Sequence, residues 1–138
     1  MLSEPTLSLV KYRLERAWES LASAERDLNA ESLKASANRS YFCVFHAMRS
    51  VLALDGFDSK KHSGVISAFR NKYIKPGIFR PELSDIIRDV FNIRSKSDYE
   101  DFFVISKEDV ILQIENASVF LTAVEAYINS LSTEAKAE

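Results

Sequence analysis

Glycine and proline are scarce in this sequence, with three of each among its 138 residues. A protein built from short strands needs many more of both, because glycine and proline supply the backbone conformations of tight turns. An apolar share of 46% and a charged share of 28% instead suit long helices with few connections. The composition therefore argues against all-β folds and against alternating strands and helices.

Cysteine is nearly absent as well. Cys43 is the only one, so the chain can form neither an internal disulfide nor a zinc site of cysteine thiolates. No Glu lies three residues before either histidine, which excludes the Glu-x-x-His pairs of a di-iron helical bundle. The sequence also contains no phosphate-binding glycine loop. We therefore expect no metal site and no cofactor.

Neither sign of charge is in large excess, since 18 basic and 20 acidic residues give a formal net charge of -2. A protein without an overall positive field binds nucleic acid only through a local group of basic side chains. The sequence has no run of about 18 apolar residues, as a membrane-spanning helix requires. Residues 1–11 lack the basic and apolar segments of a secretion signal. We therefore expect a cytoplasmic protein with no membrane partner.

Apolar residues recur with helical spacing over most of the chain. In residues 7–28 they return every three or four positions, which predicts a long amphipathic helix. Residues 32–54 are apolar on nearly all sides, which predicts a helix at the centre of a bundle, ended by Gly56. Three further helices are expected, at residues 61–73, from Pro81 to Ser95 or Ser97, and from residue 106 to residue 131.

The remaining segments join or follow these helices. Residues 98–104 mix acids with aromatic residues and are expected to form an extended connection, after which Ser106 caps the last helix. The small and polar residues 132–138 predict a frayed tail. Together these features predict an all-α fold, an antiparallel bundle of four to five helices. We expect one domain over residues 1–138, with its core at about residues 6–131.

Polar residues on the central helix are informative, because buried polar groups need partners. Arg39 and His46 are seven residues apart, which is about two helical turns, so both project from one face. A guanidinium can hold a phosphate while an imidazole moves a proton at a ribose hydroxyl or a leaving oxygen. RNA cleavage without a metal ion needs this division of roles. The alternative is structural: Arg39 pairs with a carboxylate and His46 is a core histidine with its own partners.

A second polar group lies where a helix is expected to end. Arg94 and Asp98 are four residues apart, so a helical ion pair is the simplest interpretation. The alternative is that Arg94, Lys96 and Tyr99 contact the phosphate and the base or ribose of an RNA. His62 follows two lysines near a helix start, and we interpret it as part of a solvated turn rather than an anion site.

Four blocks of sequence carry a family resemblance. They are ASANRSYFCVFHA at residues 35–47, Gly56, KHSGVISAF at residues 61–69 and RSKSDYEDF at residues 94–102. In this order they resemble the compact single-domain branch of the HEPN family, over about residues 8–130. The resemblance implies a bundle of four to five helices that forms a homodimer. It also implies a partner, since such domains are often encoded beside a minimal nucleotidyltransferase.

The resemblance further implies an activity. Catalytic HEPN ribonucleases pair an Arg with a His a few residues further on, commonly followed by a Tyr, near a cleft between two copies of the chain. Here Arg94 and Tyr99 match the Arg and the Tyr, but Asp98 stands where the His is expected. Arg39 and His46 keep the spacing of the pair, on another helix. In toxin pairs of this family the nucleotidyltransferase attaches AMP to the Tyr, which makes Tyr99 a candidate modification site.

Two functions therefore stay open, and with them whether the protein is an enzyme. In the first, it is a HEPN-type RNA-binding domain or metal-independent endoribonuclease, the effector of a toxin–antitoxin or defence pair. The catalytic candidates are then Arg39, His46, Arg94 and Asp98, and the RNA- or nucleotide-binding candidates are Asn38, Lys96 and Tyr99. In the second, it is a non-catalytic nucleotide- or partner-binding module that works with a minimal nucleotidyltransferase. A structural adaptor is a third interpretation.

Overall fold

The protein is a bundle of α-helices. The computed structural model describes the backbone of residues 2–137 and the side chains of residues 2–131. It contains five α-helices: α1 (Glu4–Asn29), α2 (Leu33–Leu52), α3 (His62–Phe69), α4 (Glu82–Tyr99) and α5 (Lys107–Ala137). No β-strand occurs within the described residues, so the predicted all-α fold is confirmed.

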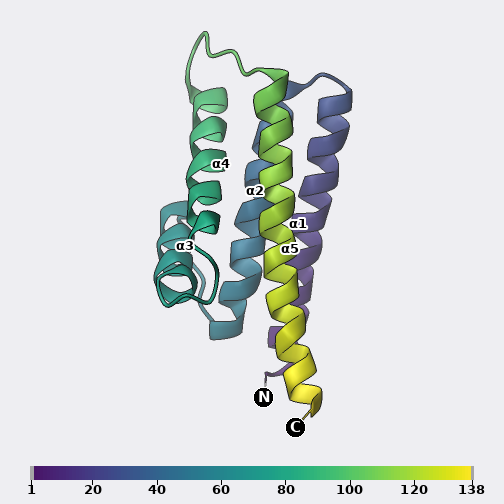
Figure 1. Cartoon of the computed structure of the whole chain (residues 1–138), viewed down its shortest axis with the longest axis vertical. Helices are drawn as coiled ribbons and strands as arrows, with labels where there is room; N and C mark the ends of the chain where they lie inside the picture. Colours follow the sequence, from purple (N-terminus) through teal and green to yellow (C-terminus); the bar gives the residue numbers. More distant parts are fainter. Residues whose placement is uncertain (1, 138) are drawn as a thin grey trace.

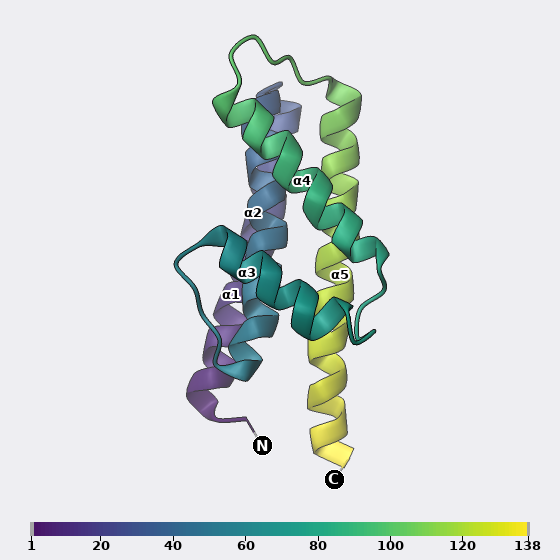
Figure 2. The same ribbon diagram turned by 90° about the vertical axis from the view of Figure 1, so that its left-hand side faces the viewer.

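Four long helices alternate in direction, with α1 and α4 running one way and α2 and α5 the other (Figure 1). The shorter α3 and the inclined α4 lie over one side of α2 (Figure 2), and α1 packs on another side. Both ends of the chain lie at the same end of the bundle (Figure 1). Because α2 contacts α1, α3, α4 and α5, it is the central helix, as its apolar surface predicted.

The helix ends follow from local hydrogen bonds. At the start of α1, the Ser3 hydroxyl accepts a hydrogen bond of 3.3 Å from the backbone N–H of Thr6, so the helix begins three residues earlier than predicted. At the start of α5, the Ser106 hydroxyl accepts one of 3.1 Å from the N–H of Asp109, which confirms the predicted cap. After α2 the backbone reverses at Gly56, whose φ of 70° is the left-handed conformation that glycine tolerates.

The end of α4 differs from the prediction. The helix continues to Tyr99, whereas residues 98–104 were expected to be an extended connection. An ion pair between Arg94 and Asp98, one turn apart, stabilises this last turn. Helix α5 runs to Ala137. The side chains of residues 132–138 lie outside the described residues, so the frayed tail stays a prediction.

One hydrophobic core joins all five helices. Its largest fully buried side chains include Tyr41, Met48, Phe69, Leu83 and Phe120. Burial of each large side chain of this kind contributes roughly 1.5–3 kcal/mol to folding. The thiol of Cys43 lies in the same core, and burial raises its pKa to about 12. No helix among the described residues is both long and apolar enough to cross a membrane.

Candidate functional site: a cluster around Phe42

Two arginines and two histidines surround the half-buried ring of Phe42 on α2. The guanidinium carbons of Arg39 and Arg94 lie 5.1 and 5.7 Å from the centre of this ring. The ring centres of His46 and His62 are each 5.9 Å from it. We call these five residues the Phe42 cluster. It brings the residue types that bind phosphate and the residue types that transfer protons to one place.

Three helices build the cluster. Arg39, Phe42 and His46 follow each other at intervals of three and four residues on α2, so they share one face of that helix. Arg94 comes from the last turns of α4, and His62 is the first residue of α3. The end of α4 and the start of α3 lie on the same side of α2 (Figure 2). The packing of α3 and α4 on α2 therefore assembles the cluster.

A chain of polar contacts fixes the α4 side of the cluster. The Nε atom of Arg94 lies 2.9 Å from Oδ2 of Asp98, an ion pair without hydrogen-bond geometry. The side-chain amide of Asn38 donates to the same carboxylate oxygen at 3.2 Å, and its carbonyl accepts from Arg39 at 2.7 Å. The ring of Tyr99 lies 5.7 Å from the Arg94 guanidinium carbon and is 74% exposed. The expected ion pair of Arg94 and Asp98 is thus confirmed, and it is tied to α2.

The imidazole of His62 is half-buried, so its interpretation as part of a solvated turn is wrong. The ring stacks on Phe45 with 4.1 Å between ring centres, and its Nδ1 lies 2.6 Å from the hydroxyl of Tyr41. In the tautomer with the proton on Nδ1, the ring donates to Tyr41 and its Nε2 can accept a proton. Burial, and then the charges of Arg94 and Arg49, lower the pKa of His62. Burial raises the pKa of Tyr41 to about 12, so its hydroxyl is neutral at pH 7.

His46 lies deeper than His62, with 8% of its surface exposed. Its pKa is lowered to about 4, first by burial and then by four positive charges, those of Arg16, Arg49, Arg39 and Arg13. An imidazole with this pKa is neutral at pH 7 and is a weak base. The burial agrees with the structural interpretation of His46, while its contact with Phe42 places it at the edge of the candidate site.

The surroundings of the two histidines carry a local excess of positive charge, although the protein as a whole has a net charge of -2. Five arginines act on their pKa values: Arg13, Arg16, Arg39, Arg49 and Arg94. Among the described residues, the carboxylates paired with these arginines are Asp58 and Asp98. No described carboxylate pairs with Arg39, so the carboxylate pairing considered for it is not observed. Its charge is available to an anion.

Comparison with known proteins identifies the family to which this helical bundle belongs. The sequence pattern of the HEPN domain matches residues 10–127. The chain belongs to the HEPN family. A UPF0332 protein of Thermotoga maritima is 32% identical over 123 residues, which cover 89% of this chain and 93% of that protein.

Two proteins of Methanocaldococcus jannaschii are also similar to this HEPN chain. "Putative toxin MJ0142" is 29% identical over 117 residues, which cover 85% of this chain and 80% of that protein. "Putative toxin MJ0605" is 26% identical over 99 residues, which cover 72% of this chain and 74% of that protein. The whole Phe42 cluster lies within the part of the chain that matches the HEPN domain.

The HEPN fold brings together most, though not all, of the residues singled out from the sequence. Asn38, Asp98 and Tyr99 adjoin the Phe42 cluster. Lys96 is exposed and follows Arg94 by two residues, which places it on a different face of α4. Within the described part of this HEPN chain, no group of three or more His, Cys, Asp or Glu side chains is arranged to hold a metal ion.

Sequence reasoning missed the pair of Tyr41 and His62. The one local signal is that Tyr41 follows Asn38 by three residues, so the two residues share a side of α2. Nothing near His62 in the sequence indicates its contact with Tyr41, because the two residues are 21 positions apart. Only the packing of α3 on α2 brings them together.

Proposed function

We propose that this HEPN protein binds single-stranded RNA at the Phe42 cluster and cleaves it without a metal ion, as the effector of a toxin–antitoxin or defence pair. The observation that carries the proposal is the position of two guanidiniums and two imidazoles within 5.1–5.9 Å of one ring, that of Phe42. Two relatives are named as toxins, which supports a role as the effector of such a pair.

The arginines of the cluster are suited to hold the phosphate of the cleaved bond. Arg39 has no carboxylate partner among the described residues, and Arg94 is oriented by Asp98. A phosphate bound between the two guanidiniums would displace water and accept a charge-assisted hydrogen bond from each of them. The exposed ring of Tyr99 next to Arg94 offers a surface on which an unpaired base can stack. Accordingly, we assign Asp98 a positioning role rather than the role of an acid.

Cleavage without a metal ion requires proton transfer at the ribose. A base takes the proton of the 2′-hydroxyl, the 2′-oxygen attacks phosphorus, and the bond from phosphorus to the 5′-oxygen breaks. The protonated base then gives its proton to the departing 5′-oxygen. The products are a strand that ends in a 2′,3′-cyclic phosphate and a strand that begins with a 5′-hydroxyl. We assign this base to His62 ahead of His46, because His62 is half-buried and its Nδ1 is held by Tyr41, whereas His46 is 8% exposed.

The second candidate function is a non-catalytic module that works with a nucleotidyltransferase. The observation that favours it is the 74% exposure of Tyr99, whose hydroxyl an enzyme could reach. The exposed Lys96 on the same helix turn would then contribute to partner binding. The pKa of His46, lowered to about 4, also fits this alternative, since that ring is a weak base and is uncharged at pH 7.

Cleavage of a mixed set of single-stranded RNAs in EDTA tests the proposal. We expect the wild type to cut RNA, and Arg39→Ala, Arg94→Ala and His62→Gln each to cut at least about a hundredfold more slowly. Arg26→Ala is the matched control, because Arg26 is an exposed arginine of α1 whose guanidinium donates a hydrogen bond to Ser23 on the same helix. Circular dichroism establishes that each variant is folded.

The outcome also separates the two functions. Equal cleavage by the wild type, His62→Gln and Arg94→Ala would contradict the assigned site. If no RNA is cut, but a nucleotidyltransferase with ATP adds AMP to the wild type and not to Tyr99→Phe, the non-catalytic module becomes the leading function. Including His46→Ala shows whether the deeper histidine takes part: loss of cleavage in a folded protein requires it, whereas unfolding identifies it as a core residue.

A further inference from the structure

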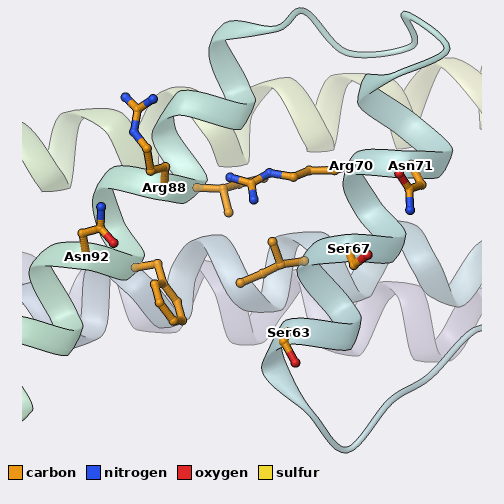
Figure 3. A pocket seen from close by; sticks show the side chains of 9 residues that line it. Ser63, Ser67, Arg70, Asn71, Arg88 and Asn92 are labelled. Carbon is orange, nitrogen blue, oxygen red and sulfur yellow. The ribbon is translucent and has the colours of Figure 1, made fainter.

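A pocket of about 460 Å³ opens between α3 and α4 (Figure 3). Its apolar lining is formed by Ile66, Ile87 and Phe91. Its polar lining includes Arg70, Asn71 and Asn92, and no carboxylate lines it. A concave, apolar site with a few convergent polar groups is the usual form of a ligand site.

The pocket lies next to the Phe42 cluster. The ring of Phe91 lies 6.0 Å from that of Tyr41, the residue whose hydroxyl contacts His62. Ser63, at the other side of the pocket, directly follows His62 on α3. A strand of nucleic acid held at His62 would therefore have its next nucleotide near the pocket.

Arg70 gives this pocket a fixed positive charge. Its Nε donates to the hydroxyl of Ser84 at 3.0 Å, and Nη2 donates to the Ser84 carbonyl at 3.1 Å. Both acceptors are neutral, and no carboxylate pairs with Arg70 in the described part of the chain. Figure 3 shows its side chain lying across the pocket toward α4. The guanidinium thus keeps its charge and further N–H donors for a ligand.

The backbone at Arg70 is unusual as well. A π-helical segment, Arg70–Ile74, follows α3, and the N–H of Lys75 donates to the Arg70 carbonyl at 2.8 Å. π-Helical turns are rare and occur frequently at functional sites. Here the wider turn carries both Arg70 and Asn71 in the lining of the pocket.

We infer that the pocket between α3 and α4 binds one base of the RNA strand, next to the nucleotide held at the Phe42 cluster, and so contributes to the choice of cleavage position. The inference rests on the proposed function. Phe91, which is 37% exposed, offers its ring for stacking, and the amides of Asn71 and Asn92 can pair with the edge of a base. Arg70 holds the adjoining phosphate. An apolar peptide would make no use of the exposed amides or of the charge of Arg70.

Titration with AMP, GMP, CMP and UMP tests the pocket directly. In nitrogen–proton NMR spectra, we expect the side-chain amide signals of Asn71 and Asn92 to shift, with one nucleotide binding more tightly than the others. The amide of Asn29, an exposed residue at the end of α1, is the control and should not move. Unchanged signals for Asn71 and Asn92, or equal shifts for Asn29, would overturn the inference.

Binding of a labelled single-stranded RNA separates failure of the pocket from failure of the proposed function. We expect Phe91→Leu and Asn92→Ala to bind about tenfold more weakly than the wild type, and Asn29→Ala to bind equally well. Asn92 is exposed, so its variant tests the pocket even if Phe91→Leu does not fold. If the wild type cuts RNA and both pocket variants bind and cut it identically, only the inference fails. If the wild type binds no RNA, the proposed function fails first.

Discussion

At the residue scale, Phe42 explains how polar side chains are accommodated on the central helix of the bundle. Its ring lies against the guanidiniums of Arg39 and Arg94, at 5.1 and 5.7 Å. A cation over an aromatic ring is stabilised by about 0.5–2 kcal/mol, depending on how far it is desolvated. Such contacts offset part of the cost of placing arginines against α2. They also leave the polar edges of both guanidiniums able to bind an anion.

His46 makes the stability of the protein depend on pH. Its pKa is about 4 in the folded protein, and it returns to its ordinary value near 6.5 on unfolding. Between these values the unfolded chain binds a proton that the folded chain does not, so stability falls as the pH falls from 6.5 to 4. The loss from this group is on the order of 3 kcal/mol, since one pKa unit corresponds to about 1.4 kcal/mol.

Urea unfolding at several pH values between 7 and 4 measures this effect. We expect the wild type to lose more of its free energy of unfolding on acidification than His46→Gln, which lacks the titrating group. Carboxylates titrate in both proteins, so the difference between the two reports on His46. Parallel pH profiles for the wild type and His46→Gln would show that the folded protein does not hold this imidazole neutral.

At the scale of elements, the last turn of α4 depends on a residue of α2. Asp98 pairs with Arg94 within α4 and accepts a hydrogen bond from Asn38 on α2. We expect Asp98→Ala to lower the free energy of unfolding by about 1 kcal/mol, because an ion pair and a hydrogen bond are lost. The variant should also cut RNA more slowly, since Arg94 is no longer oriented.

The matched control for this prediction is Asp89→Ala. Asp89 also pairs with an arginine of α4, Arg88, but the pair is exposed and, among the described residues, makes no hydrogen bond to α2. Such surface pairs contribute about 0–1 kcal/mol, so we expect little change. Thermal or urea unfolding of the two variants gives the comparison. A loss of stability as large for Asp89→Ala as for Asp98→Ala would contradict the role of the contact between helices.

The sequence predicts those elements whose cause is local. The spacing of apolar residues predicts α1 and α2, and Gly56 marks the reversal of the chain after α2. Each of these features can be predicted because its signal lies within a few residues of the sequence. The end of α4 was placed too early because part of its cause is remote: Asn38, which contacts its last turn, is 60 residues away from Asp98.

In the candidate site, too, the sequence predicts what has a local cause and not what depends on packing between helices. Arg39 and His46 lie on one face of α2, as their spacing predicted, because helix geometry alone decides this. Their meeting with Arg94 and His62 depends on how α3 and α4 pack on α2, for which the sequence holds no direct signal. His46 illustrates the limit most clearly, since spacing says on which side it lies but not that it is buried.

At the scale of the whole molecule, we propose that two copies of the chain associate through the connection between α4 and α5. This connection exposes Val104 at 85% and Phe102 at 100%, and Tyr99, at the end of α4, is 74% exposed. Exposed aromatic residues of this kind are enriched in protein interfaces. An interface here would lie beside Arg94, so that the clusters of two copies could act on one RNA.

Light scattering coupled to size-exclusion chromatography tests this association. We expect the wild type to be a dimer and Phe102→Asn to dissociate at a concentration at least about tenfold higher. Asparagine is chosen because Phe102 has a φ of 63°, which asparagine tolerates, so the backbone is retained. Leu112→Asn, at a 49% exposed position of α5, is the control. A monomeric wild type, or equal dissociation of the two variants, would contradict the proposed interface.

We propose that the Phe42 cluster cleaves RNA through the ribose 2′-hydroxyl, without a metal ion. This can be measured by incubating the purified protein in EDTA with a single-stranded RNA and with the same strand carrying 2′-O-methyl groups, and by analysing the ends of the products. We expect the RNA to be cut to 2′,3′-cyclic phosphate and 5′-hydroxyl ends while the methylated strand stays intact. An uncut RNA, or equal cutting of both strands, would contradict this mechanism.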